Sequence, residues 1–538
     1  MWFSGHVFER CVRVLNSNIR MPTFTVKRVL TRSEPQNITK LRTVLFPCLG
    51  QLFGPAQLAR SVTLFIVLGL LMVVGAAAVN AQTLRARIAI TSVAPARIRI
   101  TGGVPSAATS LSFRNNYGGV LGLGERIEKL EVSNQSGESL PVQKLAPGEY
   151  QAAQKFTRFS YDVDVGVPSR PSQMSHVSSL SPEHGLLMLA DLLPLATKDA
   201  GNFSKVAIQL DVPPGWTIRS NARSDGSGYS SDEPEKTVFM VGPSLREASR
   251  RIGLTKLSVI TSGEWPFSGD DATKTGAEII EEYLKVTGFM LKRDALVMLL
   301  PYPGESSPEK WSAETRGNVV VLLLGRRASR KTVLAMLEII LTHELFHLWV
   351  PNSLKLAGDY DWFFEGFTLY QALRTDVRLS AISFDDYLAT LARVYDSYLA
   401  SADSDTLSLL EASERRWTTS SSLVYDKGML VAFIYDLMLS NRTDCAASFD
   451  DLYKELFRLV PTGQESANET IIKVLSEREG MESFVKVYVQ SPDRVSLEPL
   501  LVPYGLQIQK TGLGTKLTVG PSLSKPQRKL LGCLGYRK

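Results

Sequence analysis

The residues best suited to chemistry are concentrated in one short segment, HELFH at 343–347. It matches the pattern H-E-x-x-H and lies within 333–349, where apolar residues recur with helical spacing. Residues four apart on a helix share one face, so His343 and His347 can bind one metal ion. Glu344 lies beside them and can act as a general base. The alternative is a structural His pair, but it would leave two buried polar rings in need of partners.

Histidine is scarce in the chain, with five residues in 538. The other three, His6, His176 and His184, lack ligand-like spacing, and we expect them to be leader or structural residues. The scarcity makes the pair in the HELFH segment informative.

A catalytic zinc site needs three protein ligands and one open position. Glu365 is the candidate for the third ligand, because the segment between it and His347 is long enough for a turn and a return. It lies in the sequence DWFFEGFT at 361–368, where an unpaired carboxylate among aromatic side chains would be costly. The alternative is an acid at a helix start, for which Asp359 and Asp361 are better candidates.

Tyr425 is a further candidate, in the sequence LVYDKG at 423–428. A phenol directed at a substrate carbonyl can stabilise the oxyanion that forms during hydrolysis. A tyrosine at the start of an apolar helix is more often a packing residue, and spacing alone favours that interpretation.

The segments HELFHLW, WFFEGFTLY and YDKG together resemble the active-site series of the gluzincin metallopeptidases. They are most similar to the glycyl aminopeptidase family (metallopeptidase family sixty-one), a relative of the alanyl aminopeptidases and thermolysin. FSYDVDV at 159–165 and GLLMLADLLP at 185–194 also resemble the β domain of that family. The resemblance covers roughly 85–505 and is strong at 341–370 and 423–430.

By motif position, the resemblance implies one zinc ion on His343, His347 and Glu365. It implies Glu344 as the catalytic acid and base, and Tyr425 as the residue that stabilises the oxyanion. The fold it implies is α+β: an N-terminal β-sandwich-like domain, then a thermolysin-like catalytic domain made of a small sheet and a helical lobe.

Two departures from the family pattern concern the substrate cleft. The segment between His347 and Glu365 is shorter than in the glycyl aminopeptidases and nearer to alanyl aminopeptidase spacing. The related aminopeptidases also carry a Gly-x-x-Glu type segment on an edge strand, whose Glu binds the substrate's free amine. The nearest equivalent here is WSAETRG at 311–317, which makes Glu314 the candidate amine anchor. The alternative is a solvated loop carboxylate paired with Arg316.

The elements that must position these residues change type along the chain. Residues 82–252 alternate apolar and polar side chains between turn-forming residues, which predicts a β domain. The predicted strands there are 85–91, 94–101, 159–165 and 206–212, and the polar, Gly/Ser-rich stretch 220–236 predicts a surface loop.

Residues 253–490 change to a small sheet followed by helices, and the resemblance implies that they form the thermolysin-like zinc peptidase domain. The predicted elements are a helix over 273–288, strands over 295–300 and 319–324, and helices over 331–350, 362–375, 384–402, 421–440, 447–459 and 467–478. Residues 491–538 are a C-terminal tail in which we expect no complete PDZ domain.

The net charge of +6 comes from the first sixty residues. These hold nine Lys and Arg against two acidic residues, whereas the rest of the chain carries a net charge of −1. The body therefore has no electrostatic footprint for nucleic acid, and we expect no nucleic-acid partner. Residues 1–60 are a basic leader or an extension upstream of the true start codon.

Residues 61–81 are apolar and end in Val79-Asn80-Ala81, the small-residue pattern of a signal peptidase site. We expect a signal peptide; the alternatives are a transmembrane helix and a buried core helix. The positive flank places the body outside the cytoplasm, periplasmic or extracellular, with membrane contact only through 61–81 if this segment is uncut. Only Cys445 and Cys533 follow it, and their spacing does not establish whether they pair.

The sequence thus predicts a zinc-dependent metallopeptidase, with an aminopeptidase as the favoured activity and peptides as substrates. Hydrolysis would use a zinc-activated water with Glu344 as general base. The alternatives are a zinc endopeptidase on the same site and an exported, noncatalytic metal-binding module.

Overall fold

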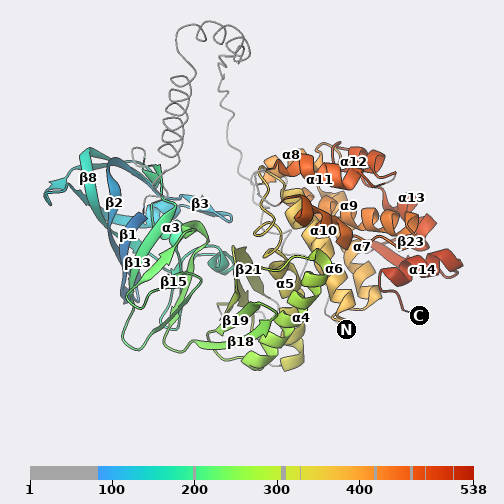
Figure 1. Cartoon of the computed structure of the whole chain (residues 1–538), viewed down its shortest axis with the longest axis horizontal. Coiled ribbons are helices and arrows are strands. Elements are labelled where there is room, and N and C mark those ends of the chain that lie inside the picture. The colour runs from blue at the N-terminus through green and yellow to red at the C-terminus, as the bar shows by residue number, and fades with distance from the viewer. Residues whose placement is uncertain are drawn as a thin grey trace, which may run out of the picture. The chain divides into compact units, whose positions relative to one another are not determined.

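The structure, a computed structural model, describes residues 83–537 apart from 195, 198–200, 304–309, 327–328, 417–420, 461–464, 479 and 513. The predicted leader (1–60) and the predicted signal or membrane segment (61–81) lie outside the described residues. Among the described helices, none combines the length and the apolar character needed to cross a bilayer. The fold is α+β, as predicted, with a sheet-rich N-terminal domain followed by a smaller sheet and helices (Figure 1).

The N-terminal β domain is built mainly from two sheets that share one core. The larger has the order β15-β16-β13-β1-β2-β8-β5-β6, with β7, β11 and β12 beside it, and the smaller has the order β14-β17-β10-β9. Ile88 and Ile98 of the larger sheet pack with Leu187 and Phe239 of the smaller one. This is the predicted β-sandwich-like arrangement. The strand bounds are β1 Thr83–Val93, β2 Ala96–Ser112, β3 Asn116–Tyr117, β4 Val120–Leu121, β5 Ile127–Ser133, β6 Ser139–Leu140, β7 Val142–Ala146, β8 Glu149–Asp164, β9 Ser179–Leu180, β10 Gly185–Met188, β11 Ala196–Thr197, β12 Gly201–Asn202, β13 Lys205–Asp211, β14 Thr217–Ser220, β15 Arg223–Ser224, β16 Tyr229–Ser231 and β17 Val238–Gly242.

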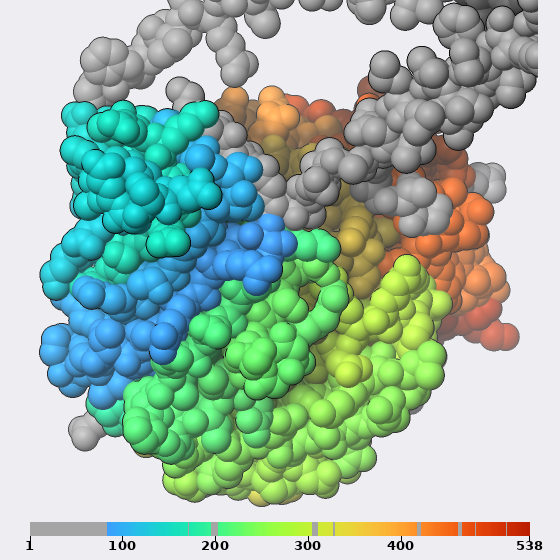
Figure 2. All heavy atoms as spheres, turned by 60° about the vertical axis from the view of Figure 1, so that its left-hand side comes forward, coloured from blue at the N-terminus to red at the C-terminus, as the bar shows by residue number. Residues whose placement is uncertain are grey.

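The smaller sheet is buried on both faces, which explains the continuous apolar sequences of β10 and β17. Successive side chains of a strand point to opposite faces. Leu187 and Phe239 thus join the sandwich core, while Met188 and Met240 pack against the next sheet of the chain. A space-filling view shows the green C-terminal part of the β domain bordering the yellow-green residues that follow it (Figure 2). Strands covered on both faces read as unbroken apolar runs.

The next sheet has five strands in the order β18-β19-β20-β22-β21. Its strands are β18 Arg246–Ile252, β19 Thr255–Thr261, β20 Ala295–Pro301, β21 Trp311–Arg316 and β22 Val319–Leu324. Strands β19, β20 and β22 are parallel, and β21 pairs antiparallel with β22 at the edge. The sheet already begins at β18, before residue 253. Helix α4 (Gly269–Thr287) connects β19 to β20, and α5 (Arg330–Phe346) follows β22; both pack on the face away from the β domain.

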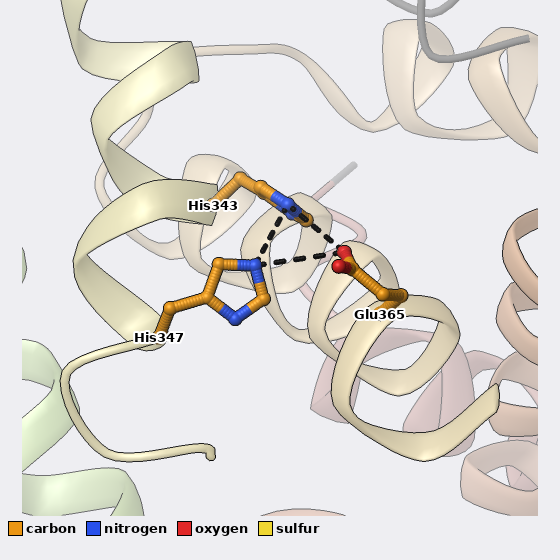
Figure 3. A group of neighbouring side chains, drawn as sticks. All are labelled: His343, His347 and Glu365. Carbon is orange, nitrogen blue, oxygen red and sulfur yellow. Dashed lines mark hydrogen bonds and ion pairs between the residues drawn. The ribbon is translucent and has the colours of Figure 1, made fainter. Parts of the chain in front are cut away.

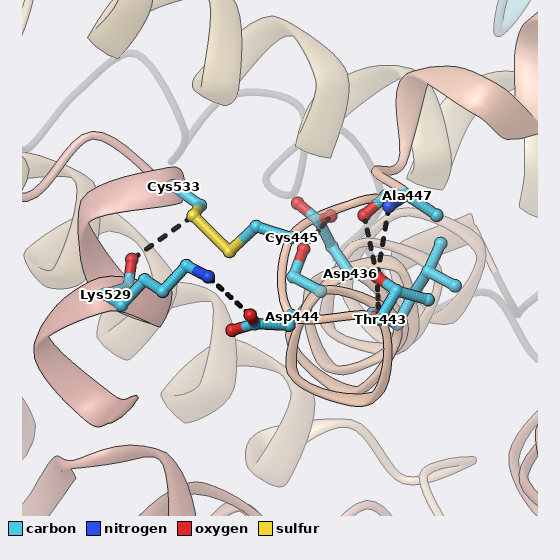
Figure 4. Close-up of a disulfide and its surroundings, with 9 residues drawn as sticks. Asp436, Thr443, Asp444, Cys445, Ala447, Lys529 and Cys533 are labelled. Carbon is cyan, nitrogen blue, oxygen red and sulfur yellow. Dashed lines mark hydrogen bonds and ion pairs between the residues drawn. A yellow bond between two sulfur atoms is a disulfide. The ribbon is translucent and has the colours of Figure 1, made fainter. Parts of the chain in front are cut away.

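The helical part continues the core that α4 and α5 begin. Its elements are η5 Trp362–Phe367, α6 Thr368–Arg378, α7 Phe384–Ala400, α8 Leu409–Glu414, α9 Ser421–Arg442, α10 Asp450–Leu459, α11 Ala467–Ser476, α12 Glu482–Tyr488, α13 Leu497–Leu501, the hairpin strands β23 Leu506–Thr511 and β24 Gly514–Val519, and α14 Lys525–Cys533. A disulfide between Cys445, after α9, and Cys533, at the end of α14, holds this last segment (Figure 4).

Among the predicted boundaries that differ from the structure, two concern the type of element. The stretch 220–236, predicted to be a loop, contains β15 and β16, which extend the larger sheet beside β13. The helix predicted to reach residue 350 ends at Phe346. Pro351 explains why the helix stops short of residue 350, because a proline disfavours helical geometry in the residue before it.

Candidate metal centre and active site

Helix α5 places the two histidines of the HELFH segment at its C-terminal end. The Ser329 side chain accepts a hydrogen bond from the Thr332 amide at the other end, and the apolar residues between pack on the five-stranded sheet. His347 is the C-cap residue, and its Nδ1 lies 2.9 Å from the Val350 carbonyl oxygen. Because that bond takes the ring proton, His347 Nε2 presents a lone pair, the arrangement a metal ligand needs.

Glu365 lies on η5, a single turn of π-helix that leads into α6. Such turns are rare and occur often at functional sites. Gly366 allows η5 to pack directly on α9: a Cβ atom there would meet the Gly428 Cα and the Val424 carbonyl oxygen, each at 2.6 Å. The two glycines of WFFEGF and YDKG therefore bring Glu365 and Tyr425 to the same place.

The structure brings His343, His347 and Glu365 together (Figure 3). The two Nε2 atoms are 3.1 Å apart, and each is 3.6 Å from Glu365 Oε2. Ligand atoms at 2.0–2.2 Å from a tetrahedral zinc ion are about 3.3–3.6 Å from one another, so the spacing fits zinc. Two imidazole nitrogens that face each other beside a carboxylate have the donor chemistry of such a site.

The charges around Glu365 favour its ionised form. Burial opposes that charge, but Arg416, His347 and His343 outweigh it and hold the pKa of Glu365 well below its usual range. Burial likewise disfavours protonated His347, yet Glu365 and Glu344 raise its pKa. A negative, buried carboxylate beside two imidazoles is ready to bind a cation.

Glu344 is fixed by a residue that the motifs did not reveal. The Thr315 hydroxyl oxygen, on edge strand β21, lies 2.7 Å from Glu344 Oε2 and 2.9 Å from its backbone oxygen. The Glu344 side chain is almost fully buried. Thr315 directly follows the candidate anchor in WSAETRG, so the alternation of that strand is the only sequence signal for it.

Tyr425 contacts the ligand group through a second unanticipated residue, Arg416. Arg416 Nη2 lies 2.6 Å from the Tyr425 hydroxyl and 2.9 Å from Glu365 Oε1, and Nη1 donates to Asp361. Burial opposes the charge of Arg416, but Tyr425, Glu365 and Asp361 outweigh it and raise its pKa. Asp361, one of the two candidates for an acid at the helix start, makes no side-chain cap hydrogen bond. Asp361 lies four residues before Glu365, so the two carboxylates share one face of the helix. That spacing was the available sequence signal for a basic residue that binds both.

Glu314 lies on β21 with its side chain directed at the β domain. Its Oε1 accepts hydrogen bonds from Tyr117 and from Arg316 Nε, at 2.9 Å from the latter, and its Oε2 lies 2.5 Å from His176 Nδ1. Burial opposes its charge, but Arg316 and His176 lower its pKa to about 2. The pairing with Arg316 is present, but on a largely buried strand and not in a solvated loop. Thr315, the next residue, points to the opposite side, towards Glu344.

No protein-family model and no curated protein matches the chain. Among solved structures, it is similar to the aminopeptidase N family protein from Idiomarina loihiensis, with 18% identity and a TM-score of 0.68 over 80% of this chain and 79% of that one. The M1 zinc metallopeptidase from Deinococcus radiodurans matches with 13% identity and a TM-score of 0.48, over 78% of this chain and 95% of that one. At this identity, the likeness to the Idiomarina protein shows that the two chains share a fold.

Proposed function

We propose that the chain is a zinc-dependent metallopeptidase, with aminopeptidase activity as its favoured form. The observation that carries this proposal is the convergence of His343, His347 and Glu365, with Glu344 next to them on the same helix. The fold shared with the Idiomarina protein, which is described as belonging to the aminopeptidase N family, is consistent with it. The glycyl aminopeptidase resemblance remains a proposal about the narrower family.

The chemistry divides between the ion and the chain. Zinc bound by these three residues would supply a Lewis acid that polarises a carbonyl and lowers the pKa of water towards neutrality. Glu344 takes a proton from the attacking water as the carbon–oxygen bond forms, and passes it to the leaving nitrogen as the carbon–nitrogen bond breaks. Tyr425 donates a hydrogen bond to the carbonyl oxygen as that oxygen gains negative charge.

The test is zinc content and peptide hydrolysis by the purified protein and by Glu344→Gln. We expect one zinc ion per chain in both, and a loss of kcat of at least a hundredfold in the variant, because general acid–base catalysis typically contributes that much. Glu338→Gln makes the same change on α5 away from the two histidines and should keep full activity. An active wild type without stoichiometric metal would contradict the zinc assignment.

An endopeptidase on the same site is the second candidate. It is favoured by the contacts of Glu314, because a substrate amine would compete with Tyr117, His176 and Arg316 for the same carboxylate. Peptides with free and N-acetylated termini separate the two activities. If Glu314 is the amine anchor, Glu314→Gln raises KM for free peptides alone; equal cleavage of blocked peptides would favour the endopeptidase.

We propose that the protein is exported, with the segment 61–81 as its signal. The bridge between Cys445 and Cys533 supports this, because disulfides persist mainly in oxidising compartments. The mature N-terminus, determined by mass spectrometry, tests it: a first residue of Gln82 is expected for a cleaved signal.

A further inference from the structure

Arg416 is a buried arginine outside the sequence motifs that connects the candidate ligand Glu365 with Tyr425. Its side chain is 10% exposed and lies over the rings of Phe364 and Tyr425, at 5.6 and 5.3 Å from their centres. These cation–π contacts and the bond to Asp361 fix the plane of the guanidinium. A rigid fork of donors in this position can orient two partners at once.

Arg416 distinguishes the two carboxylate oxygens of Glu365, because it donates a hydrogen bond to one of them and the other faces the histidines. Nη2 carries two protons, and it is 2.9 Å from Glu365 Oε1 and 2.6 Å from the Tyr425 hydroxyl. Since Arg416 bonds Oε1, the other oxygen, Oε2, is the one that faces both imidazoles at 3.6 Å. The guanidinium therefore favours binding of a metal through one oxygen of the carboxylate.

The same nitrogen, Nη2, orients the phenol of Tyr425 through a second hydrogen bond. A hydroxyl that accepts a hydrogen bond from a guanidinium must direct its own proton away from that donor. For Tyr425 this makes the hydroxyl a donor towards other groups, as a stabiliser of an oxyanion must be. One nitrogen atom thus couples the geometry of a candidate ligand to that of a candidate catalytic residue.

Asp361 completes the group. It is 9% exposed, and it would face Glu365 as a second buried carboxylate if Arg416 were absent. Burial and the nearby Glu365 raise the pKa of Asp361, with Arg416 opposing them. Asp361 and Glu365 therefore contact the guanidinium from two sides. Asp361 anchors it, and it in turn positions Glu365.

We propose that Arg416, anchored by Asp361, is a positioning residue that presents one oxygen of Glu365 to the metal and orients the hydroxyl of Tyr425. This inference rests on the proposed function. Arg416 is neither a proposed zinc ligand nor the proposed general base.

The first experiment measures zinc affinity by competition with a chelator, in the full chain and in Arg416→Lys and Arg416→Met. We expect the zinc dissociation constant to rise ten- to a hundredfold in Arg416→Met, the usual effect of removing a group that orients a ligand. Arg416→Lys keeps the charge and should recover part of the affinity. The matched control is Arg374→Met: Arg374 is 7% exposed and pairs with Asp436 and Asp450 at 2.9 and 2.6 Å. It should lower the unfolding temperature without changing zinc affinity.

The second experiment measures kcat of the metal-saturated enzymes in a double-mutant cycle with Tyr425→Phe. If Arg416 acts through the Tyr425 hydroxyl, Arg416→Lys lowers kcat about tenfold or more in the wild-type background. It lowers kcat much less once that hydroxyl is gone, whereas its effect on zinc affinity is the same in both backgrounds. A merely structural role would give equal losses of kcat in both backgrounds.

The outcomes separate this inference from the proposed function. A wild-type chain that binds no zinc and cleaves no peptide would contradict the proposed function, and the inference with it. A loaded, active wild type whose zinc affinity is unchanged within twofold in Arg416→Met, or whose kcat loss is independent of Tyr425, would contradict the inference alone.

Discussion

Thr315 is the residue through which an edge strand holds the proposed general base. Its hydroxyl is 2.7 Å from Glu344 Oε2, and a hydrogen bond to a charged group contributes about 1.5–3 kcal/mol. Thr315→Val keeps the shape and removes this bond. We expect kcat/KM to fall about tenfold and the unfolding temperature to fall by a few degrees, measured by peptide hydrolysis and thermal unfolding.

The control is Thr368→Val, the same substitution at a buried hydroxyl that has no partner among the described residues. Because an unpaired buried hydroxyl is costly, that variant should be at least as stable as the wild type and should remain active. Equal kcat/KM in Thr315→Val and the wild type would mean that this hydroxyl does not orient Glu344.

Asp426, the neighbour of Tyr425, is a buried carboxyl whose charge the fold disfavours. Burial raises its pKa to about 7, against the opposing hydrogen bond of 2.7 Å from Ser397. The unfolded chain ionises near pH 3.9, so the folded state keeps a proton that the unfolded state has lost. The contribution of this group to stability is therefore complete below about pH 4 and is lost as the pH rises through 7.

Asp426→Asn should remove that dependence, because the amide stays neutral. We expect the variant to gain stability relative to the wild type as the pH rises, by roughly 2.5 kcal/mol between pH 5 and pH 8. Denaturant unfolding at pH 5 and pH 8 measures the difference. If the difference in the free energy of unfolding between the two proteins is the same at pH 5 and pH 8, the raised pKa is contradicted.

At the scale of elements, the close contact of η5 and α9 is what places Glu365 near Tyr425. A Cβ atom at Gly428 would lie 2.8 Å from the Trp362 carbonyl oxygen and 2.9 Å from the Gly366 Cα, and both are backbone atoms. Gly428→Ala should therefore separate the two elements and destabilise the fold by about 1–3 kcal/mol. It should also lower kcat.

Gly532→Ala in α14 is the matched control, because nothing lies within 4 Å of its added Cβ atom. Alanine is the better helix former, so this variant should gain up to about 1 kcal/mol and keep its activity. Thermal unfolding and peptide hydrolysis of both variants distinguish a loss of packing from a general effect of alanine. A Gly428→Ala enzyme as stable and active as the wild type would show that the contact is not needed.

Elements with a strong hydrophobic period were predictable to within a few residues. The helix predicted over 384–402 is α7, and the strand predicted over 319–324 is β22. Spacing and resemblance also anticipated which residues of the site would meet. Arg416 and Thr315 were missed, because the alternation of β21 and the spacing of Asp361 and Glu365 do not identify their partners, and the contacts depend on how α8, η5 and β21 pack. The short elements after residue 490 escaped for the same reason: they are stabilised by contacts with α7 and α9.

At the scale of the whole chain, the β domain contributes side chains next to the candidate site. Tyr117 and His176 contact Glu314 on β21, the strand whose next residue holds Glu344. The smaller sheet of the β domain also packs on the five-stranded sheet that carries this strand. The edge strand β21 therefore contacts the β domain on one side and the proposed general base, Glu344, on the other.

The disulfide links the end of the chain to the helix that carries Tyr425. Cys445 and Cys533 are 88 residues apart in sequence, and they join the turn after α9 to α14 (Figure 4). A cross-link over such a separation typically contributes about 2–5 kcal/mol. The neighbouring ion pair of Lys529 and Asp444 is exposed and contributes at most about 1 kcal/mol.

Cys445→Ser should therefore lower the unfolding temperature markedly, and a reducing agent should do the same to the wild type but not to the variant. Peptide hydrolysis at 25 °C should remain close to normal, because the bridge contacts none of the residues proposed for zinc or catalysis. Thermal unfolding with and without dithiothreitol, together with a count of free thiols, measures both effects. Unchanged unfolding of the reduced wild type would mean that the bridge does not stabilise the fold, and free thiols at Cys445 and Cys533 in the untreated wild type would remove the support that the bridge gives to export.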